Sequence, residues 1–358
     1  MRDTSSRITE RETTTTKLVD ANRVIALWGF TEAALGGILH ALKFPFTGLL
    51  IGCAAVVFIT LIFQLTGSGK AILRATFIVL LVKATVNPYA QFAAYFAVGL
   101  QGLLGYLFFT TIRFKRVAAL LLGIFALTFS AVQKLIFLTV VFGTSLWKSI
   151  DTFAHFVLTQ IPFLKHSPSF SFSIVIISVY TGIHLLAGII AGLKAANFPL
   201  WLEKKSKTVG RMRIDFAGGE EFFNKNRKSN RKHSLRKIPS YIIFIFLFSL
   251  MLVSYIFPQL DSNLFYYVVF TIIRSVLIMF IWFSVISPIA VKYFKRFVEK
   301  KKFKHASEIN KITVLFTGFR KIINYCWKNS SSLRGRKRLV KFFSDSLALL
   351  LLADVEPD

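Results

Sequence analysis

Residues Phe46–Thr66 read FTGLLIGCAAVVFITLIFQLT, an apolar run without a single charged side chain. At 1.5 Å per residue a helix of this length covers about 30 Å, the thickness of the hydrocarbon core of a bilayer. Val117–Phe142 and Tyr241–Phe257 are comparable runs. Because a segment in lipid must satisfy its own backbone hydrogen bonds, such runs predict helices. The predicted fold class is therefore all-α, a polytopic membrane helical bundle.

The apolar runs predict about eight transmembrane helices. The third is the least apolar because it holds Arg74 and Lys83. Asn87-Pro88 separates it from the fourth, since proline disfavours helical geometry in the residue before it. The expected spans are Val24–Leu42, Phe46–Thr66, Ala71–Val86, Ala90–Ile112, Val117–Phe142, Phe170–Leu193, Tyr241–Phe257 and Leu264–Val291.

The charge pattern predicts the orientation. The formal net charge is +28, from 45 basic and 17 acidic residues. Lys194–Lys237 holds 13 Lys or Arg residues and Lys292–Lys341 holds 16, whereas the connection Pro258–Asn263 holds none. Basic loops stay in the cytoplasm, where they also attract anionic lipid. We therefore expect an inner (plasma) membrane protein with both termini cytoplasmic, bound to anionic lipid and not to nucleic acid.

The arrangement of spans and basic segments predicts five parts. The connecting loops near residues 43–45, 87–89 and 143–169 are poor in basic residues and are expected outside the cell. The expected parts are a polar cytoplasmic tail (1–23), a six-span membrane bundle (24–193), a basic cytoplasmic linker (194–240), a two-span hairpin (241–292) and a basic amphipathic cytoplasmic tail (293–358).

Several kinds of chemistry are excluded. Thr66–Lys70 is similar to a phosphate-binding loop, but that motif requires glycine at the position of Gln64 and Ser or Thr at the position of Ala71. The two cysteines, Cys53 and Cys326, have no spacing typical of a metal site or a disulfide framework. We expect no enzyme activity, no cofactor and no metal.

The first span carries small residues at every fourth position, namely Gly29, Ala33, Gly37 and Ala41. In lipid, apolar side chains gain no hydrophobic free energy by leaving lipid for another helix, so helices associate through close packing. Small residues let the helix backbones approach closely enough for this packing. The row is interpreted either as a docking face for another subunit or as ordinary packing inside the bundle.

Ionisable residues within the spans suggest a binding pocket. A charged side chain at mid-span costs about 2.5–3.5 kcal/mol on insertion scales, so it turns towards a partner, water or a ligand. The groups are expected to converge on a cavity that opens outward and favours an anionic or zwitterionic solute. Alternatively, the lysines extend separately to the interface. The candidate substrate-binding residues are Glu32, His40, Lys83, Asn87, Gln91 and Lys134.

The C-terminal part is predicted to form cytoplasmic amphipathic helices. Between Ser307 and Trp327 apolar residues recur at helical spacing, and a second pattern follows Arg334-Gly335. Basic residues lie between the apolar ones, which is typical of a helix on anionic lipid. The alternative is a surface that a soluble partner protein binds.

The chain resembles a family of transporters. Residues 24–193, with the small row of the first span and Gly99, Gly102 and Gly105, are similar to the S component of energy-coupling-factor (ECF) vitamin transporters. Residues 235–352 are faintly similar to the T component, whose Ala-Arg-Gly-like coupling motif is matched by Leu333-Arg334-Gly335. The resemblance implies ATPase and T-component partners, with Arg334 and Gly335 as coupling residues.

Two functions follow as expectations. The first is a membrane subunit of an uptake transporter that binds a small solute from outside and docks on energising subunits. The second is a non-transport membrane scaffold whose basic cytoplasmic tail recruits a partner protein or anionic lipid.

Overall fold

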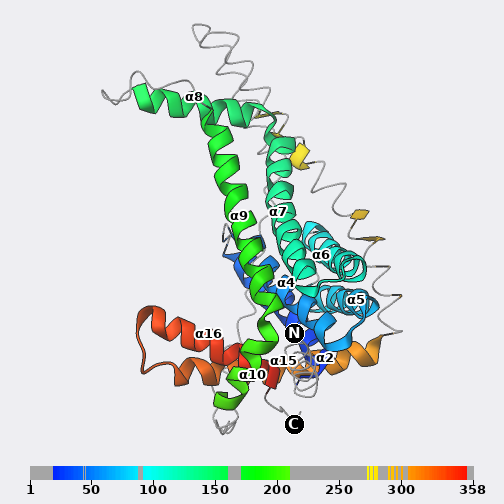
Figure 1. Ribbon diagram of the computed structural model, residues 1–358. Helices are drawn as coiled ribbons and strands as arrows, with labels where there is room; N and C mark the ends of the chain where they lie inside the picture. Colours follow the sequence, from blue (N-terminus) through cyan, green and yellow to red (C-terminus); the bar gives the residue numbers. More distant parts are fainter. Residues whose placement is uncertain are drawn as a thin grey trace, which may run out of the picture. The chain divides into compact units, whose positions relative to one another are not determined.

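The computed structural model describes residues 19–42, 44, 46–87, 92–159, 171–209, separate positions between 272 and 300, and 305–352. These residues form helices and no strand (Figure 1), which confirms the all-α class. The bounds are α2 Ala21–Phe30, η1 Thr31–Leu35, α3 Gly36–Ala41, α4 Thr47–Thr66, α5 Gly69–Val86, α6 Phe92–Thr111, α7 Lys115–Phe142, α8 Ser145–Thr159, α9 Phe172–Ala196, α10 Phe198–Val209, α15 Ala306–Asn329 and α16 Gly335–Leu352.

Four helices of the described part are long and apolar enough to cross a membrane, which indicates a membrane protein. They are α4, α6, α7 and α9, and they match the second, fourth, fifth and sixth expected spans. The eighth span is described only at scattered positions, and the seventh, Tyr241–Phe257, lies outside the described residues. The count of eight spans and the orientation stay predictions.

The first and third expected spans are helical but differ from the other four. The first consists of α2, the π-helical turn η1 and α3 in succession. The third is α5, which has 18 residues and carries Lys70, Arg74 and Lys83. Three cations in so short a helix explain why its apolar character is weaker than that of its neighbours.

One connection differs from its predicted form. Residues 143–169 are expected as an outer loop, but Ser145–Thr159 form the helix α8. The segment lacks a continuous apolar run because its apolar residues occupy one helix face only. An amphipathic helix of this kind is easily mistaken for a loop when spans are sought by hydropathy.

The chain divides into two compact units, and α7 and α9 contribute to both. The first comprises residues 1–131, 181–219 and 291–358, and the second comprises 132–180 and 220–290. In the first unit α2 packs against α4, α5 and α15, while α4 and α5 also pack against α6. The fully buried side chains at its centre include Trp28, Ile59, Leu81 and Phe319.

The two C-terminal helices form a hairpin that belongs to this core. The apolar stripe of α15 is buried against α2 and α5, and the Phe30 ring lies 5.2 Å from that of Phe316. The Arg23 Nε donates to the Leu350 carbonyl at 2.8 Å, and Lys205 of α10 pairs with Asp345 of α16 at 2.8 Å. The apolar face expected to meet lipid or a partner thus meets the chain's own helices over most of α15.

Close glycine contacts join α7 to α9 within the first unit. A Cβ added at Gly123 would lie 2.2 Å from the Gly188 carbonyl oxygen, and one at Gly192 would lie 2.6 Å from that of Ala119. No side chain fits at such distances, so the two backbones touch directly. This is the packing that small residues permit between membrane helices.

Candidate functional site

The candidate site begins with an irregularity in the first predicted span. The helix widens to a π-helical turn at Thr31–Leu35 before it resumes at Gly36. The Thr31 hydroxyl donates to the Leu27 carbonyl at 2.8 Å, which occupies an acceptor of the preceding turn. Single π-helical turns are rare and are found frequently at functional sites. Here the turn carries Glu32, the only acidic residue of that span.

Glu32 forms a buried ion pair with Lys83 of α5. The Lys83 Nζ lies 2.7 Å from the Glu32 Oε2, and the two side chains are 7% and 3% exposed. The ammonium also lies 3.5 Å from the Ala94 carbonyl oxygen and 5.9 Å from the centre of the Tyr95 ring. Pairing removes much of the cost of burying either charge, and it makes each charge depend on the other.

The second carboxylate oxygen of Glu32 is unsatisfied. Its Oε1 is buried and accepts no hydrogen bond from any residue that the structure describes. A buried carboxylate oxygen without a donor carries the full cost of its lost hydration. A ligand that donates a hydrogen bond to this atom would therefore gain more than the same donor gains in water.

Asn87 completes the described polar group beside the ion pair. It follows α5 directly, and its backbone carbonyl accepts from the Tyr95 hydroxyl at 3.0 Å. A Cβ added at Gly37 would lie 3.3 Å from the Asn87 Nδ2, so the first helix passes close to this amide. Residues from η1, α3, α5 and α6 thus meet at one end of the helical bundle.

The structure brings together three of the six predicted substrate-binding residues, namely Glu32, Lys83 and Asn87. Lys134 belongs to the other compact unit, where its exposed side chain lies 5.5 Å from the centre of the Tyr180 ring. The His40 side chain and Gln91 lie outside the described residues. For Lys134, His40 and Gln91, a place in the shared pocket stays a prediction.

Tyr95 is a member of the group that the sequence analysis missed. It is buried, and its ring and hydroxyl contact both Lys83 and Asn87. A tyrosine inside an otherwise apolar span needs a partner for its hydroxyl, and this was the available signal.

The predicted docking row lies mostly against the chain's own helices. A Cβ added at Gly29 would lie 3.3 Å from the Val82 Cγ1, Ala33 is buried, and Gly37 faces Asn87. The side chain of Ala41 lies outside the description. The contacts at Gly29 and Gly37 support packing inside the bundle, and docking on another subunit stays a prediction.

Of the predicted coupling residues, Arg334 ends the turn between α15 and α16, and Gly335 begins α16. Gly335 has a φ of 57°, a left-handed conformation that glycine adopts without strain. Arg334 precedes it and is exposed. The glycine is thus explained by the turn, and a coupling role for this pair stays a prediction.

No group of His, Cys, Asp or Glu that could hold a metal ion occurs among residues 19–87, 92–159, 171–209 and 305–352 as far as these are described. The polar group described above can bind a ligand through opposite charges and hydrogen bonds.

Comparison with known proteins gives no match: no family model fits the chain, and neither a curated protein nor a solved structure matches it.

Proposed function

We propose that this chain is the solute-binding membrane subunit of an uptake system, and that the Glu32–Lys83 pair is the centre of its binding site. The observation that carries the proposal is the buried ion pair with an unsatisfied Glu32 Oε1. An ionisable pair within a membrane bundle costs free energy and persists where it serves a substrate path or a proton relay.

The charges select a class of solute. One carboxylate and one ammonium lie 2.7 Å apart, and both side chains are buried. A small zwitterion can insert between them, pairing its cation with Glu32 and its anion with Lys83. The Tyr95 ring lies 5.9 Å from the Lys83 Nζ, and its hydroxyl donates to the Asn87 carbonyl, so these two residues would orient such a solute. The energy for uptake would come from separate ATPase subunits.

The experiment is to identify small molecules that co-purify with the detergent-solubilised full chain by mass spectrometry. Glu32→Gln keeps the shape of the side chain and removes its charge, and we expect it to lower the bound solute at least about tenfold, equivalent to about 1.4 kcal/mol. Thr60→Val is the matched control, because Thr60 of α4 is also buried and polar but carries no charge. Equal amounts of solute on wild type and Glu32→Gln would reject the proposal.

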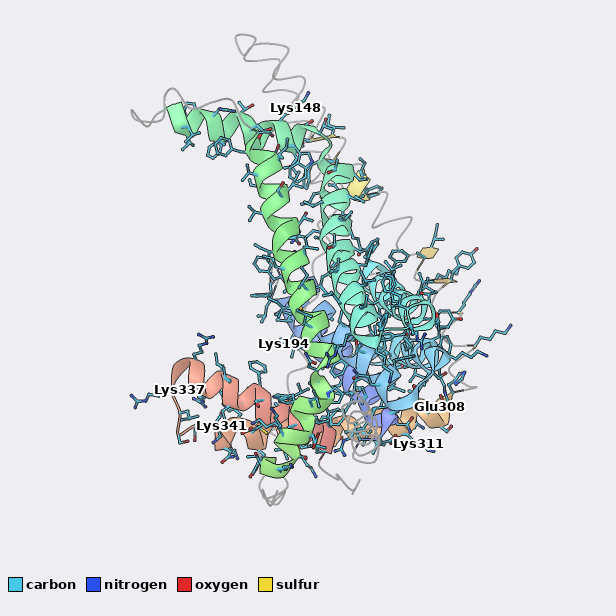
Figure 2. All side chains as sticks on the ribbon, viewed as in Figure 1. Lys148, Lys194, Glu308, Lys311, Lys337 and Lys341 are labelled. Carbon is cyan, nitrogen blue, oxygen red and sulfur yellow. The ribbon has the colours of Figure 1, made fainter. Side chains whose placement is uncertain are left out.

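A scaffold function has a separate observation in its favour. Leu339, Val340 and Phe343 of α16 are exposed among basic residues, and Lys337 and Lys341 mark this helix in Figure 2. Such a surface suits anionic lipid or an acidic partner. If Leu339→Ser and Phe343→Ser abolish capture by anionic vesicles while no solute co-purifies, the scaffold is the better account.

A further inference from the structure

Helix α8 has one apolar face and one polar face along its whole length. Leu146, Ile150, Phe153 and Val157 recur at the spacing of one helix face, whereas Thr152 and His155 lie opposite. Its 15 residues cover only about 22 Å, less than a hydrocarbon core of about 30 Å. A helix this short does not span that core, and its amphipathic pattern is typical of helices that lie along a membrane surface.

The second unit holds α8 across the ends of α7 and α9 (Figure 1). The Trp147 Nε1 donates to the Thr139 hydroxyl of α7 at 3.0 Å. At α9, the Asp151 carboxylate accepts from the Ser173 backbone N–H at 2.7 Å and from the Ser171 hydroxyl at 2.9 Å. Two attachments on different helices fix the direction in which α8 presents its apolar face.

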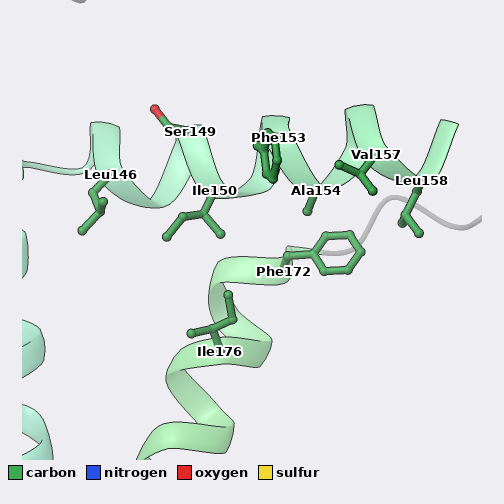
Figure 3. A pocket seen from close by; sticks show the side chains of 9 residues that line it. All are labelled: Leu146, Ser149, Ile150, Phe153, Ala154, Val157, Leu158, Phe172 and Ile176. Atoms are coloured by element: carbon green, nitrogen blue, oxygen red, sulfur yellow. The ribbon is translucent and has the colours of Figure 1, made fainter. Parts of the chain in front are cut away.

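An apolar groove of about 500 Å³ lies between this face and the start of α9. Its size falls within the roughly 300–1,000 Å³ of sites that bind organic molecules. Figure 3 shows Ile150, Ala154 and Leu158 pointing towards the side on which Phe172 and Ile176 lie. Ser149 is the one polar residue among those that line the groove, and it points away.

The neighbouring surface indicates what fills the groove. α9 is long and apolar enough to cross a membrane, and Ile174 and Val179 near its start are 64% and 56% exposed. Ile176 lines the groove and lies three residues before Val179, on the same face of α9, so the groove continues this exposed apolar surface. Phe153 at its rim is 68% exposed, a costly arrangement in water.

We propose that α8 lies in the membrane interface and that a phospholipid acyl chain occupies the groove between α8 and α9. The exposed Lys148 of α8 has the charge to pair with the lipid phosphate. The lipid would hold the outer ends of α7 and α9 at a fixed depth. This role is independent of solute binding at Glu32 and Lys83.

The first test places spin labels on the two faces of α8. Phe153→Cys and Thr152→Cys are made in the full chain with Cys53→Ala and Cys326→Ala, then reconstituted in vesicles of phosphatidylcholine and phosphatidylglycerol. At Phe153 the label should collide more often with oxygen than with a water-soluble nickel chelate, and at Thr152 the order should reverse. Water-like collision rates at both sites would overturn the interfacial placement.

The second test asks what fills the groove. Vesicles doped with a chain-labelled phospholipid should give a motionally restricted signal with the wild-type chain. Ala154→Trp fills the groove and should abolish the part of this signal that comes from lipid held between α8 and α9. Thr152→Trp, on the opposite face of α8, should leave that part intact. An unchanged signal in Ala154→Trp rejects the lipid. Dipolar broadening between labels at Phe153 would show instead that a second copy of the chain covers the groove.

Discussion

Removing the Lys83 ammonium leaves the Glu32 carboxylate buried without a counter-charge. We expect Lys83→Met to lower the free energy of unfolding by about 3–5 kcal/mol, because breaking one half of a buried pair strands the other. Adding Glu32→Gln should restore most of the loss, since no buried charge then remains. Thermal unfolding in detergent measures both effects, with Lys148→Met as the exposed control. If Lys83→Met were as stable as wild type, water would have to reach the Glu32 carboxylate, and the buried pair would be contradicted.

The sequence could indicate that Glu32 and Lys83 needed partners, but not that they are each other's partner. The cost of burying a charge follows from residue type and position in the span. Which groups meet depends on helix rotation, and the π-helical turn at Thr31–Leu35 changes that rotation without a sequence signal. This is also why Lys134, flagged on the same energetic grounds, could not be assigned a neighbour in advance.

The contact between α7 and α9 predicts a sharp difference between two glycines of one helix. A Cβ at Gly188 would lie 2.5 Å from the Gly123 carbonyl oxygen, whereas nothing lies within 4 Å of a Cβ at Gly182. We expect Gly188→Leu to destabilise the protein by more than the roughly 1–3 kcal/mol typical of overpacking, because backbone must move. Gly182→Leu is the matched control and should be tolerated. The measurement is size-exclusion thermostability, and equal losses in both variants would contradict the contact.

Docking of the C-terminal hairpin can be tested in the same way. Phe319 is fully buried, whereas Phe343 on the neighbouring helix is 65% exposed. Phe319→Ala should cost about 3–5 kcal/mol and speed hydrogen exchange throughout α15, while Phe343→Ala should change neither. Rapid exchange in α15 of the wild-type chain would show that the tail is not docked on α2.

The attachment of α8 to α9 gives a dependence on pH. The backbone hydrogen bond from Ser173, followed by the serine hydroxyls, lowers the pKa of Asp151 below its ordinary 3.8. A carboxyl group with a lowered pKa in the fold contributes stability above its unfolded pKa and loses it as the pH falls through the folded value. A spin label at Thr152→Cys should therefore stay immobile from pH 7 to 5 and gain mobility below about pH 4. In Asp151→Ala, which removes both acceptor oxygens, the label should be mobile at every pH, and a pH-independent wild type would contradict the attachment.

The sequence predicted where the helices begin and end better than it predicted what each helix packs against. The expected span Val117–Phe142 is close to α7, Lys115–Phe142, because a long apolar run permits little else. The apolar stripe of Ile312, Phe316 and Phe319 likewise predicted α15. A stripe shows that one face is covered, but lipid, a partner and the chain's own helices are all apolar enough to cover it. Only the tertiary contacts with α2 and α5 decide between them.

For the molecule as a whole, the basic segments predict one orientation in the membrane. Uptake requires that the solute site be reached from outside and that α15 and α16 lie where ATPase subunits or cytoplasmic lipid are found. The sequence predicts this arrangement through its positive-inside bias, with 13 and 16 basic residues in the two segments assigned to the cytoplasm. The described helices show which segments are apolar enough to cross a membrane, but not which side of the membrane is the cytoplasm.

Cysteine labelling in intact cells tests this orientation most directly. Thr144 lies in the turn between α7 and α8, and Ser332 lies in the turn between α15 and α16, and both are exposed. In the full chain with Cys53→Ala and Cys326→Ala, a membrane-impermeant maleimide should label Thr144→Cys in intact cells. It should label Ser332→Cys only after the cells are permeabilised. Labelling of Ser332→Cys in intact cells, or protection of Thr144→Cys until permeabilisation, would contradict the orientation on which solute uptake from outside depends.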